Sequence, residues 1–162
     1  MKLGSCGLAV AALSASACST LTKSETPAEA QSAKQENTEA SVLLSGVADA
    51  RIAAGDCGMI LWTLDAERPL PVLRFVAGGR ADIAINGAPV SLSLTGASGA
   101  SGFGVYEEQT YESEGGVKMT VSVRFGQGFD GGAYLHRGLI TLEQPDGWRS
   151  VTPAAGIAGC RG

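Results

Sequence analysis

The chain has 162 residues but only one histidine, 6% aromatic residues, and fewer basic than acidic residues, 12 against 16. A chain with net negative charge has no basic patch with which to hold phosphates, so nucleic-acid binding is not expected. The histidine and the cysteines, which lie far apart in the sequence, do not have metal-ligand spacing. The sequence therefore predicts no metal site.

One glycine pattern matches a nucleotide-binding motif in its letters only. Gly126, Gly128 and Gly131 have the spacing of the dinucleotide fingerprint, which requires a strand before it, a helix after it and no anion within it. Here the residues from Ala133 onward indicate a strand, and Asp130 stands where phosphate would bind. We therefore interpret the segment as a hairpin loop and predict no cofactor.

The single histidine, His136, is the obvious candidate for a general base. In that role it would need a nucleophile such as Ser98 or Ser101 and an acid to orient it. The residues around Ser98, Gly96-Ala-Ser-Gly, lack the spacer residue of a nucleophile elbow. A lone histidine in a predicted strand is more typical of a surface or packed side chain. We therefore predict that the chain is not an enzyme.

Glycine is abundant, with 23 residues, whereas there are only three methionines, and this balance favours short strands and turns over helices. Alternating apolar and polar residues recur at hairpin spacing and indicate about eight strands. We predict an all-β body, a single antiparallel sandwich or small barrel. Besides the hairpin described next, the strand-like segments include Cys57–Asp65, Leu70–Ala77, Val105–Ser113, Val117–Phe125, Ala133–Glu143 and Trp148–Thr152.

The clearest local signal is an Asn-Gly pair at Asn86 and Gly87, between two alternating runs. This pair favours a type I′ turn, because both central residues of such a turn need a positive φ. The turn would place Ile83 opposite Val90 and Ala81 opposite Leu92, with the apolar residues of both strands on one face. The sequence therefore predicts a hairpin over residues 81–94.

Three stretches of small residues are predicted to be irregular. Gly96–Gly104 and Gly126–Gly132 are expected to be glycine-rich loops, and Pro153–Gly162 a terminal coil. Ala48–Ala54 fits either a short helix or a strand. Pro71 indicates an edge strand, because proline cannot donate a ladder hydrogen bond.

The amino terminus has the pattern of an export signal: Lys2, an apolar run from Leu3 to Leu13 too short to span a membrane, then Ala15-Ser-Ala before Cys18. In these 18 residues the chain resembles a bacterial lipoprotein precursor, although Ala15 stands where that family usually has leucine. The resemblance implies cleavage before Cys18 and lipidation of that cysteine. Ala15-Ser-Ala also fits an ordinary signal-peptidase site, which would give the same amino terminus without lipid.

The sequence thus predicts three parts: a signal peptide over residues 1–17, a lipidated cysteine and disordered tether over 18–40, and a β domain over 41–162. The tether has almost no large apolar residue, so it cannot bury enough surface to offset its chain entropy. The lipoprotein resemblance implies anchoring through acyl chains. Ser19 after the cysteine implies, by likeness to sorted lipoproteins, the outer membrane of the cell envelope, facing the periplasm.

Once the signal and the lipidated cysteine are set aside, Cys57 and Cys160 are the two cysteines of the body. An even pair of cysteines in an oxidising compartment indicates a disulfide. We therefore predict a Cys57–Cys160 bridge near the two ends of the β domain.

The segment around residues 106–114 is the least ordinary exposed stretch, because it combines tyrosines with several glutamates. Tyrosine is enriched at binding surfaces, and carboxylates attract cationic partners. The carboxylates do not have the spacing of a calcium loop. A solvated strand face is the alternative interpretation. The candidate partner-binding residues are Ser101, Tyr106, Glu107, Glu108 and Tyr111.

The stretch from Ala81 to Tyr106 resembles the periplasmic C-type lysozyme inhibitors, lipoproteins with a small antiparallel barrel and a Ser-Gly-x-x-Tyr loop. The corresponding residues here are Ser101-Gly-Phe-Gly-Val-Tyr106, one residue longer, and the Lys-Gly pair expected later is absent, since Lys118 precedes Met119. The resemblance implies a loop that enters the lysozyme cleft, and hence a cationic protein such as lysozyme as a partner.

Overall fold

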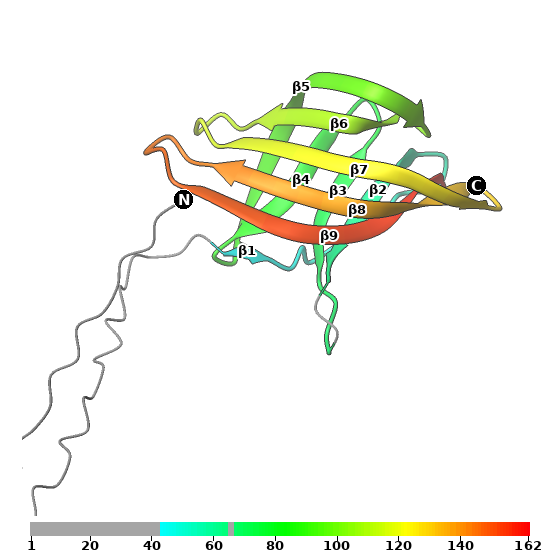
Figure 1. Ribbon diagram of the computed structural model, residues 1–162, viewed down its shortest axis with the longest axis horizontal. Helices are drawn as coiled ribbons and strands as arrows, with labels where there is room; N and C mark the ends of the chain where they lie inside the picture. Colours follow the sequence, from blue (N-terminus) through cyan, green and yellow to red (C-terminus); the bar gives the residue numbers. More distant parts are fainter. Residues whose placement is uncertain (1–42, 65–66) are drawn as a thin grey trace, which may run out of the picture. The chain divides into compact units, whose positions relative to one another are not determined.

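The structure is a computed structural model and describes residues 43–64 and 67–162, in which nine β-strands form one sheet (Figure 1). Strands β5 to β9 follow one another across the near wall in Figure 1, and β2 to β4 form the wall behind them. The strands are β1 (Leu44–Ser45), β2 (Cys57–Thr63), β3 (Pro71–Val76), β4 (Arg80–Ile85), β5 (Ala88–Gly102), β6 (Val105–Glu112), β7 (Lys118–Phe129), β8 (Gly132–Glu143) and β9 (Arg149–Cys160).

The sheet closes into a barrel of eight antiparallel strands. Each strand from β2 to β9 pairs with the next one in sequence, and β9 returns to pair with β2. The short β1 pairs with the end of β4, beyond the residues that β3 covers. The all-β prediction is confirmed, and of its two forms the small barrel is the one observed.

Because the barrel is closed, the predicted edge strand at Pro71 is wrong. β3 lies between β2 and β4, and Pro71 is its first residue. It pairs with Trp62 at a point where the register of β2 shifts. The start of a strand and a bulge are the positions at which a missing donor is tolerated.

The interior of the barrel is filled with side chains. Alternate residues of β2 to β9 point inward and form one apolar core, as the two-residue period of a strand requires. The predicted alternation of Val117–Phe125 is seen there, with Met119, Val121 and Val123 fully buried. The largest buried side chains are Tyr111, Phe75, Met59, Leu61, Leu73, Ile83, Leu92, Met119, Leu135, Ile140, Leu142 and Gln109.

The Asn-Gly hairpin forms as predicted. Asn86 and Gly87 have φ values of 50° and 82°, and the pairing of β4 with β5 includes Ile83 with Val90 and Ala81 with Leu92. Ala81 and Leu92 are fully buried. The register is therefore fixed both by the turn and by the apolar face that it places in the core.

The three predicted irregular stretches of small residues are wrong, because strands run through most of them. β5 continues to Gly102, and β9 continues to Cys160. β7 and β8 are separated only by the two-residue turn at Asp130 and Gly131. Small residues suit these strands because neighbouring backbones approach closely. A β-carbon built on Gly156 would lie 2.0 Å from the carbonyl oxygen of Ile60. The segment 48–54, left open between helix and strand, is neither of them.

We expect the substitution Gly156→Ala to lower the free energy of unfolding by about 1–3 kcal/mol, because the added methyl group overpacks the contact between β9 and β2. Gly128→Ala is the matched control, also within a strand, where the added carbon would find its nearest neighbour at an ordinary 3.7 Å. Denaturant unfolding of both variants measures the difference. Equal stabilities would show that close backbone approach does not require Gly156.

Candidate binding surfaces

Several predictions concern residues outside the described part of the chain. These are the signal peptide, the lipidated Cys18, and the tether over residues 18–40. Within residues 43–64 and 67–162, no helix has the length and apolar character needed to cross a bilayer.

The predicted disulfide between Cys57 and Cys160 is present. The two cysteines are register partners on β2 and β9, with their Cα atoms 3.9 Å apart. These strands carry the first and last parts of the barrel wall, 103 residues apart in sequence. The bridge therefore fastens the pair of strands that closes the barrel.

Ser101 and Tyr106 face each other near the tip of the β5–β6 hairpin, where they are register partners. Both are exposed, Tyr106 to 37%. Between them the chain turns at Phe103 and Gly104, both with positive φ. A β-carbon on Gly104 would lie 2.3 Å from that of Ala77, so the tip rests on the turn between β3 and β4. The predicted loop is thus a tight hairpin packed against the barrel.

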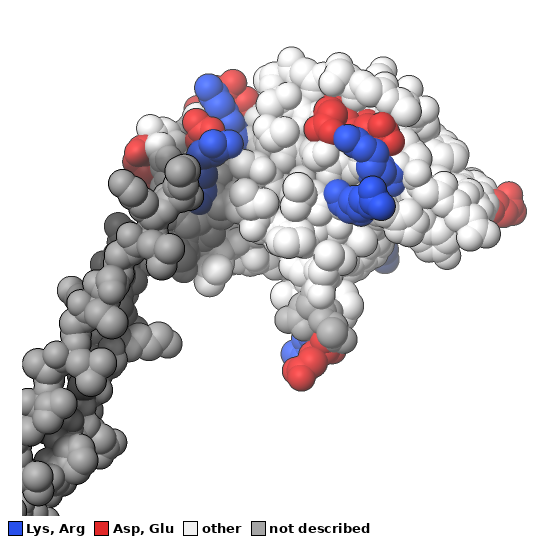
Figure 2. Space-filling view, viewed as in Figure 1, with Lys and Arg blue, Asp and Glu red and all other residues white. Residues whose placement is uncertain are grey.

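Glu107 and Glu108 are half-buried and lie beside Arg124 of β7. Figure 2 shows acidic and basic side chains in contact on the near face of the barrel. The guanidinium of Arg124 is 3.0 Å from Glu108 and 3.7 Å from Glu107. A hydrogen bond from Ser122, followed by the bond and charge of Arg124, lowers the pKa of Glu108 below its ordinary value. The two carboxylates are therefore partly neutralised within the chain, which reduces their attraction for a cationic partner.

The prediction that Tyr111 is a partner-binding residue is wrong, because its side chain is fully buried in the core. Its ring packs edge-on against Phe75, with the ring centroids 5.5 Å apart. Its hydroxyl oxygen accepts a hydrogen bond from the amide of Gln109, whose side-chain oxygen accepts one from the backbone N–H of Tyr106. The two-residue period of β6 could have predicted this burial, because Val105, Gln109 and Tyr111 share the inward face of the strand.

His136 lies on the outer face of β8, opposite Arg124, and is exposed. It lines neither of the two described pockets. In the described part of the chain, no group of three or more histidine, cysteine, aspartate or glutamate side chains is arranged to hold a metal ion.

One pocket, with a volume of about 290 Å³, lies on the outside of the barrel beside the disulfide, and we call it the seam pocket. Ile60 of β2 and Ile157 of β9 line it, together with Ile52, Phe129 and residues near them. Gly58 and Gly159, which face each other across the two strands, also line it.

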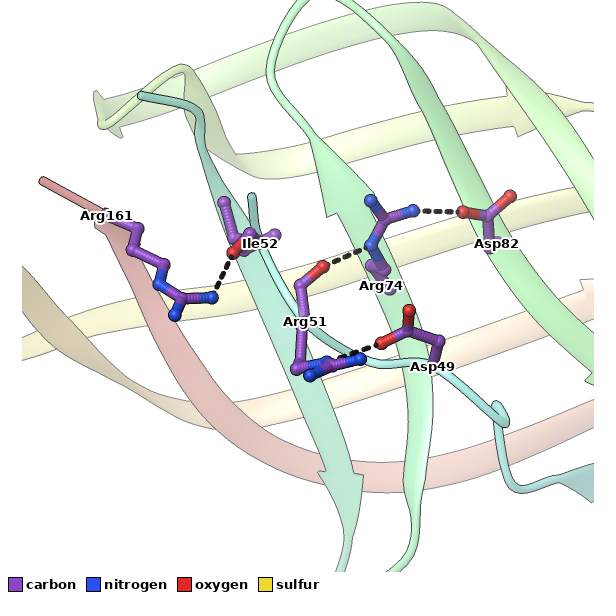
Figure 3. A network of polar contacts seen from close by, with 6 residues as sticks. All are labelled: Asp49, Arg51, Ile52, Arg74, Asp82 and Arg161. Carbon is purple, nitrogen blue, oxygen red and sulfur yellow. Dashed lines mark hydrogen bonds and ion pairs between the residues drawn. The ribbon is translucent and has the colours of Figure 1, made fainter. Parts of the chain in front are cut away.

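The segment 50–52 forms one side of the seam pocket and is held by two arginines from other parts of the chain (Figure 3). Arg74 of β3 donates to the carbonyl oxygen of Arg51 at 2.6 Å, and Arg161 donates to that of Ile52 at 3.3 Å. Arg74 also pairs with Asp82 at 2.7 Å. Hydrogen bonds to its backbone thus fix this irregular segment against the barrel.

Comparisons with protein-family models, with curated proteins and with solved structures give no match.

Proposed function

We propose that the chain is a membrane-anchored lipoprotein of the cell envelope whose barrel is a non-catalytic binding module. The observation that carries this proposal is the Cys57–Cys160 disulfide, because such bonds persist in oxidising compartments outside the cytosol. It agrees with the export signal predicted over residues 1–17, which ends before Cys18. Lipid on Cys18 would then hold the barrel at the membrane, most simply at the outer membrane facing the periplasm.

The packed interior supports binding at the outer surface. Tyr111, Phe75 and Met59 are among the side chains that fill the core, and the seam pocket opens on the outside of the barrel. His136 is exposed and is not part of the lining of either described pocket, which favours a binding role over catalysis.

We expect the full chain, expressed in a Gram-negative host, to partition into the detergent phase of a phase-separation experiment. The reason is that acyl chains on Cys18 would supply the hydrophobic anchor. The variant Cys18→Ser should remain in the aqueous phase. Recovery of a soluble mature wild-type protein with an unmodified Cys18 would contradict the proposal of a lipid anchor.

Inhibition of lysozyme is a second candidate function, favoured by the pairing of Ser101 with Tyr106 at an exposed hairpin end. A tyrosine ring with a polar tip suits insertion into a polar cleft. The neighbouring Glu107 and Glu108 share one arginine, Arg124, so the group keeps a net negative charge that can steer a cationic protein.

In this case the purified protein should slow the turnover of cell-wall substrate by lysozyme, and Tyr106→Ala with Glu108→Ala should abolish the effect. Thr110→Ala with Glu112→Ala is the matched control, because these residues are exposed on the same strand. No inhibition at excess protein would eliminate this candidate and leave the anchored binding module. Equal inhibition by the two double variants would place the contact elsewhere on the barrel.

A further inference from the structure

A row of three exposed rings crosses the outer face of the β7–β8 hairpin beside the seam pocket. Phe129 and Tyr134 have ring centroids 5.1 Å apart, and Tyr134 and His136 have nearly parallel rings 6.3 Å apart. Phe129 and Tyr134 are 42% and 48% exposed. We call Phe129, Tyr134 and His136 the ring row.

Two glycines allow the outer rings of the row to lie against the strands. A β-carbon on Gly126 would meet the imidazole of His136 at 2.1 Å, and one on Gly132 would meet the ring of Phe129 at 2.5 Å. Each of these two rings therefore lies over a glycine, in space that the side chain of a larger residue would occupy. The row is held at the surface by the strands beneath it rather than by burial in the core.

The ring row is continuous with the seam pocket. Phe129 lines the pocket, and Tyr134 is the register partner of Ile157, which also lines it. At about 290 Å³ the pocket is at the small end of ligand sites, so it has room for one substituent or one ring of a longer molecule.

The polar groups around the pocket carry both signs of charge. Arg161 and Arg51 lie on its lining together with Asp130 of the β7–β8 turn. Within the described residues Arg161 forms no ion pair, whereas Arg51 is paired with Asp49. With Arg51 paired to Asp49, Arg161 and Asp130 leave the lining with one charge of each sign. Such a lining favours a neutral ligand with many hydroxyl groups over a net anion or a net cation.

We infer that the ring row and the seam pocket together bind a neutral oligosaccharide with apolar substituents such as N-acetyl groups. The C–H faces of successive sugar rings would pack on Phe129, Tyr134 and His136. An acetyl methyl group would enter the apolar pocket between Ile60 and Ile157, and Asp130 and Arg161 would bond the hydroxyls. This inference does not depend on the lipid anchor or on the lysozyme candidate.

The test is calorimetric titration of the full chain with chitotetraose, and with cellotetraose as the same linkage without acetyl groups. We expect saturable binding of chitotetraose and weaker binding of cellotetraose. Tyr134→Ala should weaken chitotetraose binding at least about fivefold, the equivalent of one aromatic contact. Leu139→Ala, on the same strand and 45% exposed, is the matched control and should bind like the wild type.

A second variant moves a ring without removing it. Gly126→Ala has only the flexible imidazole of His136 in its way and no positive φ, so the barrel should tolerate it while the ring shifts off the strand. It should also weaken chitotetraose binding. The inference is overturned if chitotetraose does not bind, or if Tyr134→Ala and Gly126→Ala bind it as the wild type does. Binding of sodium decanoate in place of chitotetraose would likewise overturn it and assign the pocket to aliphatic anions.

Discussion

Replacement of both Cys57 and Cys160 by alanine is expected to lower the free energy of unfolding by about 4–5 kcal/mol. The bridge joins residues 103 apart and so closes almost the whole body into one loop in the unfolded state. Its loss therefore raises the conformational entropy of the unfolded chain. Against a total stability of about 5–15 kcal/mol, such a loss leaves the barrel marginally stable. Guanidinium unfolding of the oxidised wild type and the double variant measures the difference.

Reduction of the wild type with a phosphine should lower its free energy of unfolding by as much as the double substitution does. The same treatment should leave the stability of the double variant unchanged. The seven register pairs between β2 and β9 should still close the barrel in the folded variant, because they do not depend on the bridge. Free-thiol labelling under denaturing conditions checks the starting material. Two reactive thiols in the untreated wild type, or a loss of stability below about 1 kcal/mol in the variant, would contradict this prediction.

The parts of the fold that could be predicted from the sequence have local causes. The hairpin at Asn86 and Gly87 needs only a turn with positive φ and two alternating strands. The alternation of Val117–Phe125 likewise places Met119, Val121 and Val123 in the core without reference to other strands. Cysteine pairing followed from the number of cysteines and the expected compartment rather than from any contact.

The parts that could not be predicted depend on contacts between distant strands. Gly156 is required by the carbonyl of Ile60, nearly a hundred residues away, and nothing next to it in sequence reveals this contact. The same holds for Gly132, whose neighbours include the carbonyl oxygen of Ala158. Local composition therefore favours loops at positions where barrel closure requires strands without side chains.

The candidate site was predictable only in part, for a related reason. Tyr106 and Tyr111 stand in one acidic segment, but Tyr111 shares the inward face of β6 with Val105 and Gln109, and Tyr106 does not. Tyr106 is exposed and Tyr111 is buried. The ring row was missed because Phe129 lies in a stretch predicted to be a loop, which hid its alignment with Tyr134 and His136.

The buried ring of Tyr111 is expected to be the most costly single truncation in the core. It is the largest fully buried side chain, and it contacts both Phe75 and Gln109. Tyr111→Ala should lower the free energy of unfolding by about 3–5 kcal/mol, because it removes an aromatic ring and leaves a cavity. Tyr106→Ala removes a half-exposed ring from the same strand and should cost far less, as urea unfolding of both variants would measure. Similar losses in the two variants would contradict the central packing role of Tyr111.

The hydroxyl of Tyr111 adds a dependence on pH whose sign follows from its burial. Burial raises the pKa of the Tyr111 phenol above its ordinary value near 10, so the phenol ionises in the unfolded chain first. The stability that it contributes is complete below pH 10 and is lost as the pH rises towards the folded pKa, by about 1.4 kcal/mol at pH 11. Tyr111→Phe keeps the ring and removes the ionising group. The variant should therefore be less stable than the wild type at pH 7, because the side-chain amide of Gln109 loses the hydroxyl that accepts its hydrogen bond, and the difference should shrink between pH 9 and pH 11. A constant difference in unfolding free energy across that range would show that Tyr111 ionises equally in both states.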